Sequence, residues 1–369
     1  MKKVCLVCLT ASHYRKLIYS LLDVNLKCDF IFGNMKTSVK QLDLTFFRNA
    51  CYVPNIPIGT GRIYKMPHVQ KKLKSYDVVI NCMGILCVSS WLYMFRAKFL
   101  KQKVYLWDHG WYGREGFFKK WMKRAYFCLA DGAFLYGNYA RDLMIENGFK
   151  GEKLHVVYNS LDYDAQLKLR NQMQPSNIYI KHFGNTNPVL VMIGRLNLRK
   201  HLDMLIYAIE QLAIQGEFFN VVLIGDGEDR QTLEKLTKER GIDRQVWFYG
   251  ACYEEETNAE LIYNADLCVV PGDIGLTAMH SMMFGCPVLT HDFYPTQGPE
   301  FESIQEGKSG TFFKKGSIES LSASISRWFV EKKDLREEIR MACYKEIDEK
   351  WNPHKQLEVI KNVINLNDK

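Results

Sequence analysis

Two cations follow a short apolar run in the second half of the chain, and their spacing suits the binding of an anion. Arg195 comes just after the run 189–193, and Lys200 begins a stretch, residues 200–215, whose periodicity predicts an amphipathic helix. A helix N-terminus offers free backbone N–H groups and the positive end of the helix dipole, to which the two side chains add full charges. Together these groups fit a diphosphate. A pair of unrelated surface cations is the alternative interpretation.

Two further loops also lie between an apolar run and a predicted helix. Gly225, Asp226 and Gly227 form the first, which is either a ligand loop or a plain turn between strand and helix. In the second loop, residues 270–277, the carboxylate of Asp273 would accept hydrogen bonds from sugar hydroxyls. The last three residues of this loop would present free backbone amides to an anion, and they are Gly275, Leu276 and Thr277.

The elements that position these loops are predicted from an alternation of short apolar runs with longer amphipathic stretches, which is typical of α/β folds with parallel sheets. Strands are predicted at 4–9, 28–33, 77–81, 103–107, 132–136, 154–157, 189–193, 220–224, 245–248, 267–270 and 287–290. The main helices are predicted at 13–24, 138–148, 200–215, 228–240, 255–263 and 277–284. Residues 165–188 show little periodicity and predict a connection between two doubly wound domains. Ligands bind such folds at the carboxyl ends of the strands.

Length and composition favour a two-domain globular protein. The chain has 369 residues, of which 47% are hydrophobic and 24% charged, which excludes disordered, collagenous and multi-span membrane proteins. The formal net charge of +8 is unevenly spread, because residues 1–180 carry 27 basic and 12 acidic side chains (+15) and leave −7 for residues 181–369. The basic half therefore indicates an anionic partner, either a membrane surface or nucleic acid, or else a solvated lysine-rich surface. Because no nucleic-acid-binding motif accompanies the charge, we expect no nucleic acid partner.

The cysteines indicate a reducing compartment rather than a metal site. The 11 Cys residues are odd in number and lie scattered through apolar runs, without paired CxxC motifs or HExxH. Buried, reduced thiols in a cytosolic protein are the better interpretation. The apolar run that begins at Val4 is too short for a signal peptide, and no window of 18 apolar residues predicts a transmembrane helix.

The second half resembles the family 4 glycosyltransferases, which have the GT-B fold, two Rossmann-like domains facing across a cleft. The resemblance covers about 125 consecutive residues and continues more thinly in Asp108-His109-Gly110 and in the segment 157–162. The segments that carry it are Val191–Leu196 with Lys200, Gly225–Gly227, Ala265–Pro271, Gly275–Leu276, Gly285–Val288, Pro299–Glu300 and Glu306–Gly310. It implies a retaining, metal-independent enzyme that needs no cofactor and uses a nucleotide diphosphate sugar, UDP- or GDP-linked, as its donor.

The resemblance also implies roles for individual residues. Arg195 and Lys200 would bind the donor diphosphate, and His109 would lie beside the transferred sugar as a catalytic residue together with Asp273. Ser12 and His13 stand where relatives carry a glycine loop for the acceptor or the diphosphate. The remaining donor-binding residues would be Gly194, Gly227, Gly275, Leu276, Thr277 and His280.

One departure from the family pattern concerns two glutamates, eight positions apart, where this chain has Gly272 and His280. Asp273 is a candidate replacement for the first glutamate, and His280 for the second as a hydrogen-bond partner of a ribose hydroxyl. The substitution of both leaves room for a chain that binds a nucleotide or glycan without catalysing transfer.

A helix predicted at 117–129 carries aromatic residues opposite cations. A wheel of 100° per residue places Phe118, Trp121 and Met122 on one face, which suits the acyl boundary of a bilayer. Packing of that face on its own domain is the alternative. The opposite face has the cations Lys119, Lys120, Lys123 and Arg124, which would meet anionic headgroups. A second mixture of aromatics and cations spans 91–103.

The sequence therefore predicts an acceptor-binding domain at 1–170, a donor-binding domain at 171–345 and a C-terminal helix at 346–369 that packs back toward the first domain. The expected function is transfer of a hexose-type sugar to a glycan acceptor, carried on a polyprenyl diphosphate lipid, in the synthesis of a surface polysaccharide such as a capsule. We expect a cytoplasmic enzyme held at the inner face of the membrane. A nucleotide-sugar 2-epimerase of similar architecture and an inactive binding homologue are the alternatives.

Overall fold

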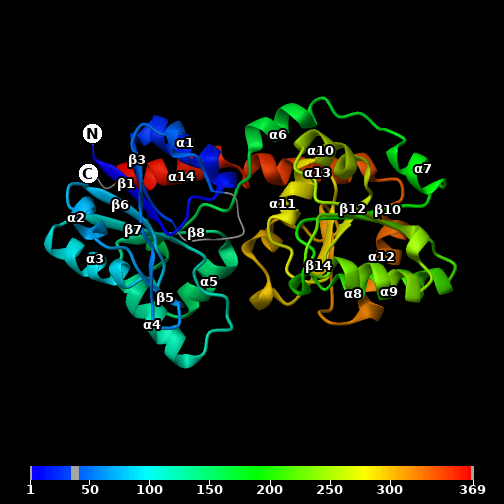
Figure 1. Ribbon diagram of the computed structural model, residues 1–369, viewed down its shortest axis with the longest axis horizontal. Coiled ribbons are helices and arrows are strands. Elements are labelled where there is room, and N and C mark those ends of the chain that lie inside the picture. Colours follow the sequence, from blue (N-terminus) through cyan, green and yellow to red (C-terminus); the bar gives the residue numbers. More distant parts are fainter. Residues whose placement is uncertain (1, 35–40, 367–369) are drawn as a thin grey trace. The chain divides into compact units, whose positions relative to one another are not determined.

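The chain divides into two compact units, which a computed structural model describes over residues 2–34 and 41–366 (Figure 1). Unit 1 consists of residues 1–162 together with 352–369, and unit 2 consists of residues 163–351. Each unit contains one parallel sheet covered by helices, as the alternating pattern predicts. Among the described residues, no helix is both long enough and apolar enough to cross a membrane.

Unit 1 is built on a seven-stranded parallel sheet. Its strands, in spatial order, are β3 (Ala50–Val53), β2 (Asp29–Gly33), β1 (Val4–Cys8), β6 (Val78–Cys82), β7 (Lys103–Asp108), β8 (Gly132–Leu135) and β9 (Leu154–Val156). The central strands are buried on both faces, which explains why they are nearly continuous apolar runs. Strand β3 and a hairpin of β4 (Ile56–Ile58) and β5 (Ile63–Lys65) were not predicted, because their sequences are short and partly polar.

Helices from distant parts of the chain cover the two faces of this sheet. One face packs against α1 (Lys16–Leu26) and α14 (Pro353–Leu366), so the red end of the chain in Figure 1 lies against the blue beginning. The other face packs against α2 (Val69–Leu73), α3 (Val88–Phe99), α4 (Phe117–Cys128) and α5 (Asn138–Glu146).

Unit 2 has a six-stranded parallel sheet in the order β12 (Val246–Gly250), β11 (Asn220–Ile224), β10 (Val189–Ile193), β13 (Leu267–Val269), β14 (Val288–His291) and β15 (Gly310–Phe313). The predicted strands and helices of this half all form, with ends that differ by a few residues. Its main helices are α8 (Leu202–Ile214), α9 (Arg230–Glu239), α10 (Glu255–Asn264), α11 (Thr277–Met283), α12 (Ile318–Glu331) and α13 (Arg336–Glu349).

The units divide at residues 162 and 351 rather than at the predicted 170 and 345. The predicted connection 165–188 contains two short helices, α6 (Tyr163–Arg170) and α7 (Ile178–Phe183), that belong to unit 2. Helix α6 is anchored there because Arg170 forms an ion pair of 2.9 Å with Asp348 of α13. These contacts are made with residues distant in sequence, so local periodicity does not reveal them.

Candidate functional site

Three loops meet at the carboxyl edge of the unit 2 sheet, and the first two are interlocked. The backbone N–H of Leu196 donates to the carbonyl of Asp226 at 3.0 Å. A Cβ atom on Gly225 would lie 1.8 Å from the carbonyl oxygen of Gly194, and one on Gly227 would lie 2.0 Å from that of Leu196. The glycines therefore let the two loops pack against each other, which is a structural requirement that precedes any contact with a ligand.

Lys200 joins the first loop to the third. Its Nζ atom donates to the carbonyls of Asp273 at 2.7 Å and Ile274 at 3.0 Å, so the ammonium lies beneath the third loop, and its remaining N–H has no partner among the described residues. Burial lowers the pKa of Lys200, while the carboxylates of Asp273 and Glu300 oppose that shift. Glu300 is 4% exposed. It was predicted only as part of the family pattern, without a role as a neighbour of Lys200.

The third loop ends in open backbone donors. In the described part of the chain, the N–H groups of Gly275, Leu276 and Thr277 donate no hydrogen bond, as expected at the start of helix α11. The Thr277 hydroxyl donates to the carbonyl of Ile193 at 2.8 Å, which ties this helix to the end of β10. The amides and Lys200 are thus held on one edge of one rigid unit.

Asp273 is engaged inside unit 2, which differs from the expectation of a carboxylate presented to a sugar. One of its oxygens pairs with the guanidinium of Arg199, and the other accepts the backbone N–H of Gly298 at 2.9 Å. The Asp273 side chain is 19% exposed. It therefore closes the third loop onto the first, a role that local sequence did not indicate because Arg199 lies 74 positions away.

Arg195 is the more exposed of the two predicted cations. Its side chain is 57% exposed, and its Nε atom lies 3.3 Å from the carboxylate of Glu228, which is 58% exposed. Exposed pairs of this kind contribute about 0–1 kcal/mol, so Arg195 can leave Glu228 for a stronger anion at little cost.

His280 is held by a carboxylate from another helix. Its Nε2 atom lies 2.9 Å from Glu255 Oε1, which also accepts the Gln166 side-chain amide at 2.7 Å. Burial alone would raise the pKa of Glu255, but the hydrogen bonds from His280 and Gln166 hold that pKa below its usual value. At the helix position where the family resemblance implies a glutamate, this chain thus has a histidine that is hydrogen-bonded to Glu255. The sequence could not reveal this pairing, because the two residues are 25 positions apart.

In unit 1, His109 follows β7 at the carboxyl edge of the sheet and its side chain is exposed. The imidazole centroid lies 4.6 Å from that of the Tyr136 ring and 5.9 Å from that of Tyr112. The next residue, Gly110, donates its N–H to the Asp108 carboxylate at 2.9 Å, which fixes the turn that presents His109.

A buried ion pair holds the loop that follows His109. Lys123 Nζ lies 2.9 Å from Glu115 Oε1, with the two side chains 7% and 3% exposed, and also donates to the carbonyl of Gly110. Glu115 accepts the N–H groups of Tyr112 and Gly113. Burial alone would raise the pKa of Glu115, but these hydrogen bonds keep it below its usual range. Lys123 is therefore a positioning residue for this loop, which corrects its prediction as a membrane cation.

Ser12 and His13 lie after β1, at the same edge of the sheet as His109, because all strands of the seven-stranded sheet are parallel. Ser12 pairs with Gln41 in an isolated bridge, and the side chain of His13 is exposed. The structure thus brings the predicted residues of each half to the carboxyl edge of their own sheet.

The predicted helix at 117–129 forms as α4, and the two large aromatics of its predicted apolar face are exposed rather than packed on their own domain. Phe118 and Trp121 are 73% and 61% exposed, whereas Tyr126 and Phe127 pack into unit 1. Lys119 and Arg124 remain exposed, while Lys120 lies over the Trp111 ring at 5.2 Å and Arg124 also donates to the Asn147 carbonyl. The wheel therefore identified the aromatic stripe correctly, and that stripe faces solvent.

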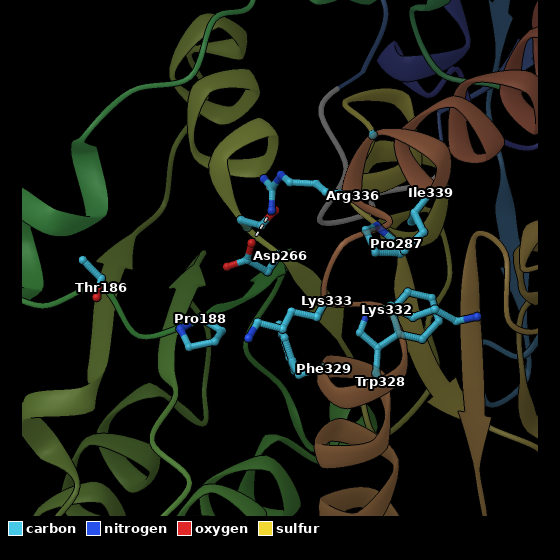
Figure 2. A pocket seen from close by; sticks show the side chains of 12 residues that line it. Thr186, Pro188, Asp266, Pro287, Trp328, Phe329, Lys332, Lys333, Arg336 and Ile339 are labelled. Atoms are coloured by element: carbon cyan, nitrogen blue, oxygen red, sulfur yellow. Dashed lines mark hydrogen bonds and ion pairs between the residues drawn. The ribbon is translucent and has the colours of Figure 1, made fainter.

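A cavity of about 360 Å³ lies in unit 2 away from these loops (Figure 2). Pro188, Asp266 and Pro287 line it just before β10, β13 and β14, so it is at the amino edge of the sheet, opposite the converging loops. Arg336 from α13 pairs with Asp266 across it and donates to the carbonyls of Tyr263 and Ala265. Arg336 is thereby fully used in holding α13 against the sheet.

Sequence comparisons place the second half among glycosyltransferases. Residues 175–346 match the family model of the glycosyl transferases group 1. The chain is 24% identical over 251 residues to an uncharacterized 41.2 kDa protein in the cps region of Klebsiella pneumoniae, covering 62% of this chain and 64% of that protein. It is 24% identical over 230 residues to alpha-D-kanosaminyltransferase of Streptomyces kanamyceticus, covering 60% and 56% of the two chains. The chain thus spans less than two thirds of the length of these relatives.

Solved structures show the same fold over the whole chain. Anabaena HepE in complex with UDP aligns with a TM-score of 0.74 at 16% identity, covering 99% of this chain and all of that one. The lipopolysaccharide outer core galactosyltransferase WaaB, in its apo form, aligns with a TM-score of 0.72 at 15% identity, covering 99% of both chains. The strand order of both sheets and the aligned structures lead to one assignment: the chain has the GT-B fold, and its segment 175–346 matches the model of the glycosyl transferases group 1.

Proposed function

We propose that this protein is a retaining glycosyltransferase that moves a hexose-type sugar from a UDP- or GDP-linked donor to a glycan acceptor carried on a polyprenyl diphosphate lipid, in surface-polysaccharide synthesis. A protein encoded in a cps region and a lipopolysaccharide galactosyltransferase are among its relatives in sequence and fold, which supports this context. The structures of HepE with UDP and with UDP-glucose support the donor class.

The observation that carries the proposal is the edge of unit 2 where Lys200 and the open amides of Gly275, Leu276 and Thr277 converge. A departing nucleotide diphosphate develops negative charge, and fixed donors aimed at that charge stabilise the transition state without reorganising. Arg195, released from Glu228, adds a second full charge. In the proposed reaction these groups act without a metal or cofactor, and the diphosphate itself accepts the acceptor proton on the face where the new bond forms.

A screen of nucleotide sugars by thermal unfolding tests this proposal. The true donor is expected to stabilise the full chain by about 2.7 kcal/mol at a hundredfold excess over its Kd. Product analysis with a lipid-linked acceptor then distinguishes the possible activities. Transfer supports the proposal, an epimerised free nucleotide sugar would show a 2-epimerase, and tight binding with no turnover of any donor would show the inactive homologue that Gly272 and His280 allow.

We also propose that unit 1 binds an anionic membrane surface, because an acceptor on a lipid must be reached at a bilayer. Helices α3 and α4 cover the same face of the unit 1 sheet, and their outer sides expose large apolar residues. These residues are Leu92 (55%), Phe95 (53%), Phe99 (87%), Phe117 (89%), Phe118 (73%) and Trp121 (61%). Exposed cations flank them at Lys98, Lys101, Lys119 and Arg124. Exposed aromatics flanked by cations fit the headgroup region of an anionic bilayer.

Co-sedimentation with vesicles of anionic lipid tests this surface. Each lysine near a charged bilayer contributes about 1 kcal/mol, so replacing Lys98 and Lys119 by glutamine is expected to weaken binding about thirtyfold. Phe118→Ser with Trp121→Ser should release the protein further. The matched control replaces two exposed aromatics of unit 2, Phe218 and Tyr253, by serine and should change nothing. Equal sedimentation of all variants would contradict membrane binding by α3 and α4 and would show that these residues form an ordinary solvated surface.

A further inference from the structure

Unit 1 contains a group of buried hydrogen-bond donors that lack acceptors. Arg15 is 9% exposed, and its Nη2 atom has no hydrogen-bond partner in the described part of the chain. The same is true of the indole N–H of Trp107, which is 3% exposed, and of the hydroxyl of Tyr19, which is fully buried. Buried donors are almost always paired in folded proteins, so three orphans require an explanation.

The side chains that carry these unpaired groups lie together, because aromatic rings surround the guanidinium of Arg15. The guanidinium carbon of Arg15 lies 4.4 Å from the centroid of the Trp107 ring, 5.6 Å from that of Tyr19 and 5.5 Å from that of Tyr136. These rings offer their faces to the cation, which is a favourable contact, but a ring face does not satisfy the N–H groups of the guanidinium.

Among the residues that the structure describes, no carboxylate forms an ion pair with this cation. The groups that act most strongly on the pKa of Arg15, besides its burial, are Tyr136, Tyr19, Cys82 and Cys8, none of which is an acid of ordinary strength. Lys123, another buried cation of unit 1, shows the usual arrangement, because Glu115 lies 2.9 Å away. A buried cation is costly unless an anion accompanies it. The unusual feature of Arg15 is therefore the missing partner.

The cluster lies where a ligand of unit 1 would bind. Arg15 ends the short helical turn His13–Arg15 that follows β1, and Trp107 is at the carboxyl end of β7. The Tyr136 ring contacts both Arg15 and the exposed His109, with ring centroids of Tyr136 and His109 4.6 Å apart. One aromatic ring thus connects the orphan donors with the residue proposed to face the transferred sugar.

We propose that the Arg15 cluster binds an oxyanion, a phosphoryl or carboxylate group, and that in the proposed transfer reaction this is an acidic group of the acceptor. The second part rests on the proposed function, whereas the first does not. The guanidinium and the indole N–H can only donate and the phenol can donate as well, so a group that accepts from all three fits better than a sugar hydroxyl, which also has a proton to donate. A planar or tetrahedral anion accepts from all three, and arginine is the side chain best shaped to bind one.

The alternative occupant is a thiolate of the protein itself. Cys8 and Cys82 are partners in the register of β1 and β6, and the hydrogen bond between their side chains, with a smaller contribution from Arg15, lowers the pKa of Cys8. An ionised Cys8 would neutralise Arg15 without a ligand. Because Cys8 is half-buried, its reactivity also offers a local probe of the cluster.

The test is the rate of Cys8 alkylation, followed by peptide mapping, with inorganic phosphate or with chloride at equal ionic strength. The pKa of Cys8 is lowered to about 6, and an anion bound at Arg15 removes one of the charges that favour its thiolate. At about pH 5, where the thiolate is the minor form, a rise of one unit in the thiol pKa slows labelling about tenfold, and phosphate is expected to have this effect. The exposed Cys128 should react equally in both buffers. Lys200→Met should keep the effect and Arg15→Gln should lose it, which places the anion in unit 1. Labelling that is insensitive to phosphate in the wild type would overturn the proposal in favour of the Cys8 thiolate.

Two further measurements are needed. The first asks whether Arg15 has only a structural role, and the second asks whether the bound anion belongs to the acceptor or is a free ion. Arg15→Met should unfold at no lower temperature than the wild type in chloride, and a marked loss of thermal stability would show a structural role instead.

With matched acceptors that differ in one acidic group, Arg15→Gln should raise KM only for the acidic acceptor. Equal KM values would refute the acceptor assignment while leaving the phosphate result intact. Absence of transfer with every acceptor would count against the proposed function alone, because alkylation is measured without turnover.

Discussion

Replacing Lys200 by methionine is expected to lower kcat/KM for sugar transfer by about two to three orders of magnitude, the usual cost of removing one fixed donor from a developing negative charge. The ammonium of Lys200 is held by the carbonyls of Asp273 and Ile274, the two residues that directly precede the free amides of the third loop. Methionine keeps most of the volume and loses the charge and the hydrogen bonds. Steady-state kinetics with the donor found in the screen, together with the affinity for the free nucleotide diphosphate, measures the loss.

The control for Lys200 is its neighbour Arg199. Arg199 is 78% exposed and pairs with the same Asp273, so Arg199→Met disturbs the loop without removing a donor from the edge. It is expected to cost less than about tenfold, because exposed ion pairs contribute little. Thermal unfolding of both variants separates loss of function from loss of fold. If kcat/KM were as high for Lys200→Met as for Arg199→Met, the diphosphate would have to be bound elsewhere.

Much of the fold follows from the pattern of the sequence, because parallel strands buried on both faces must be short apolar runs. The runs at 189–193 and 220–224 form β10 and β11 with those bounds. The glycine loops after such strands were also predicted to lie at the carboxyl edge of the sheet, and the three candidate loops of unit 2 lie there. The pattern could not predict hydrogen bonds and ion pairs between residues that are far apart in the sequence. The bond from Gln166 to Glu255 spans 89 positions, and no local signal indicates it.

The wheel for α4 shows the same limit in a different form. Periodicity established that Phe118 and Trp121 share a face, but it could not say whether that face meets the protein or the solvent. It also counted Lys123 among the surface cations, because a lysine is rarely buried. Lys123 is buried because it pairs with Glu115, which lies eight positions earlier in the loop that follows His109. The pair holds that loop in place.

Gly272 marks the departure from the family glutamates, and its surroundings explain why no side chain stands there. The backbone of the first loop crosses directly over it, with the Gly272 N–H donating to the Lys200 carbonyl at 2.9 Å and the Asp273 N–H donating to the Arg199 carbonyl at 3.0 Å. A Cβ atom at position 272 would lie 2.0 Å from the Arg199 carbonyl oxygen. The space that a glutamate side chain would need is therefore occupied by the backbone of Arg199 and Lys200.

Gly272→Ala is accordingly expected to lower the free energy of unfolding by about 3 kcal/mol or more, because a backbone clash cannot be relieved by turning a side chain. Chemical denaturation measures the loss, and Gly116→Ala is the matched control, since its Cβ would meet nothing within 4 Å. That control should stay within about 0.5 kcal/mol of the wild type. Gly272→Glu, which restores the family residue, should be no more stable than Gly272→Ala and should not improve donor binding. Tighter binding in a folded Gly272→Glu protein would contradict the close approach of the two loops and would place a vacant glutamate subsite at this position.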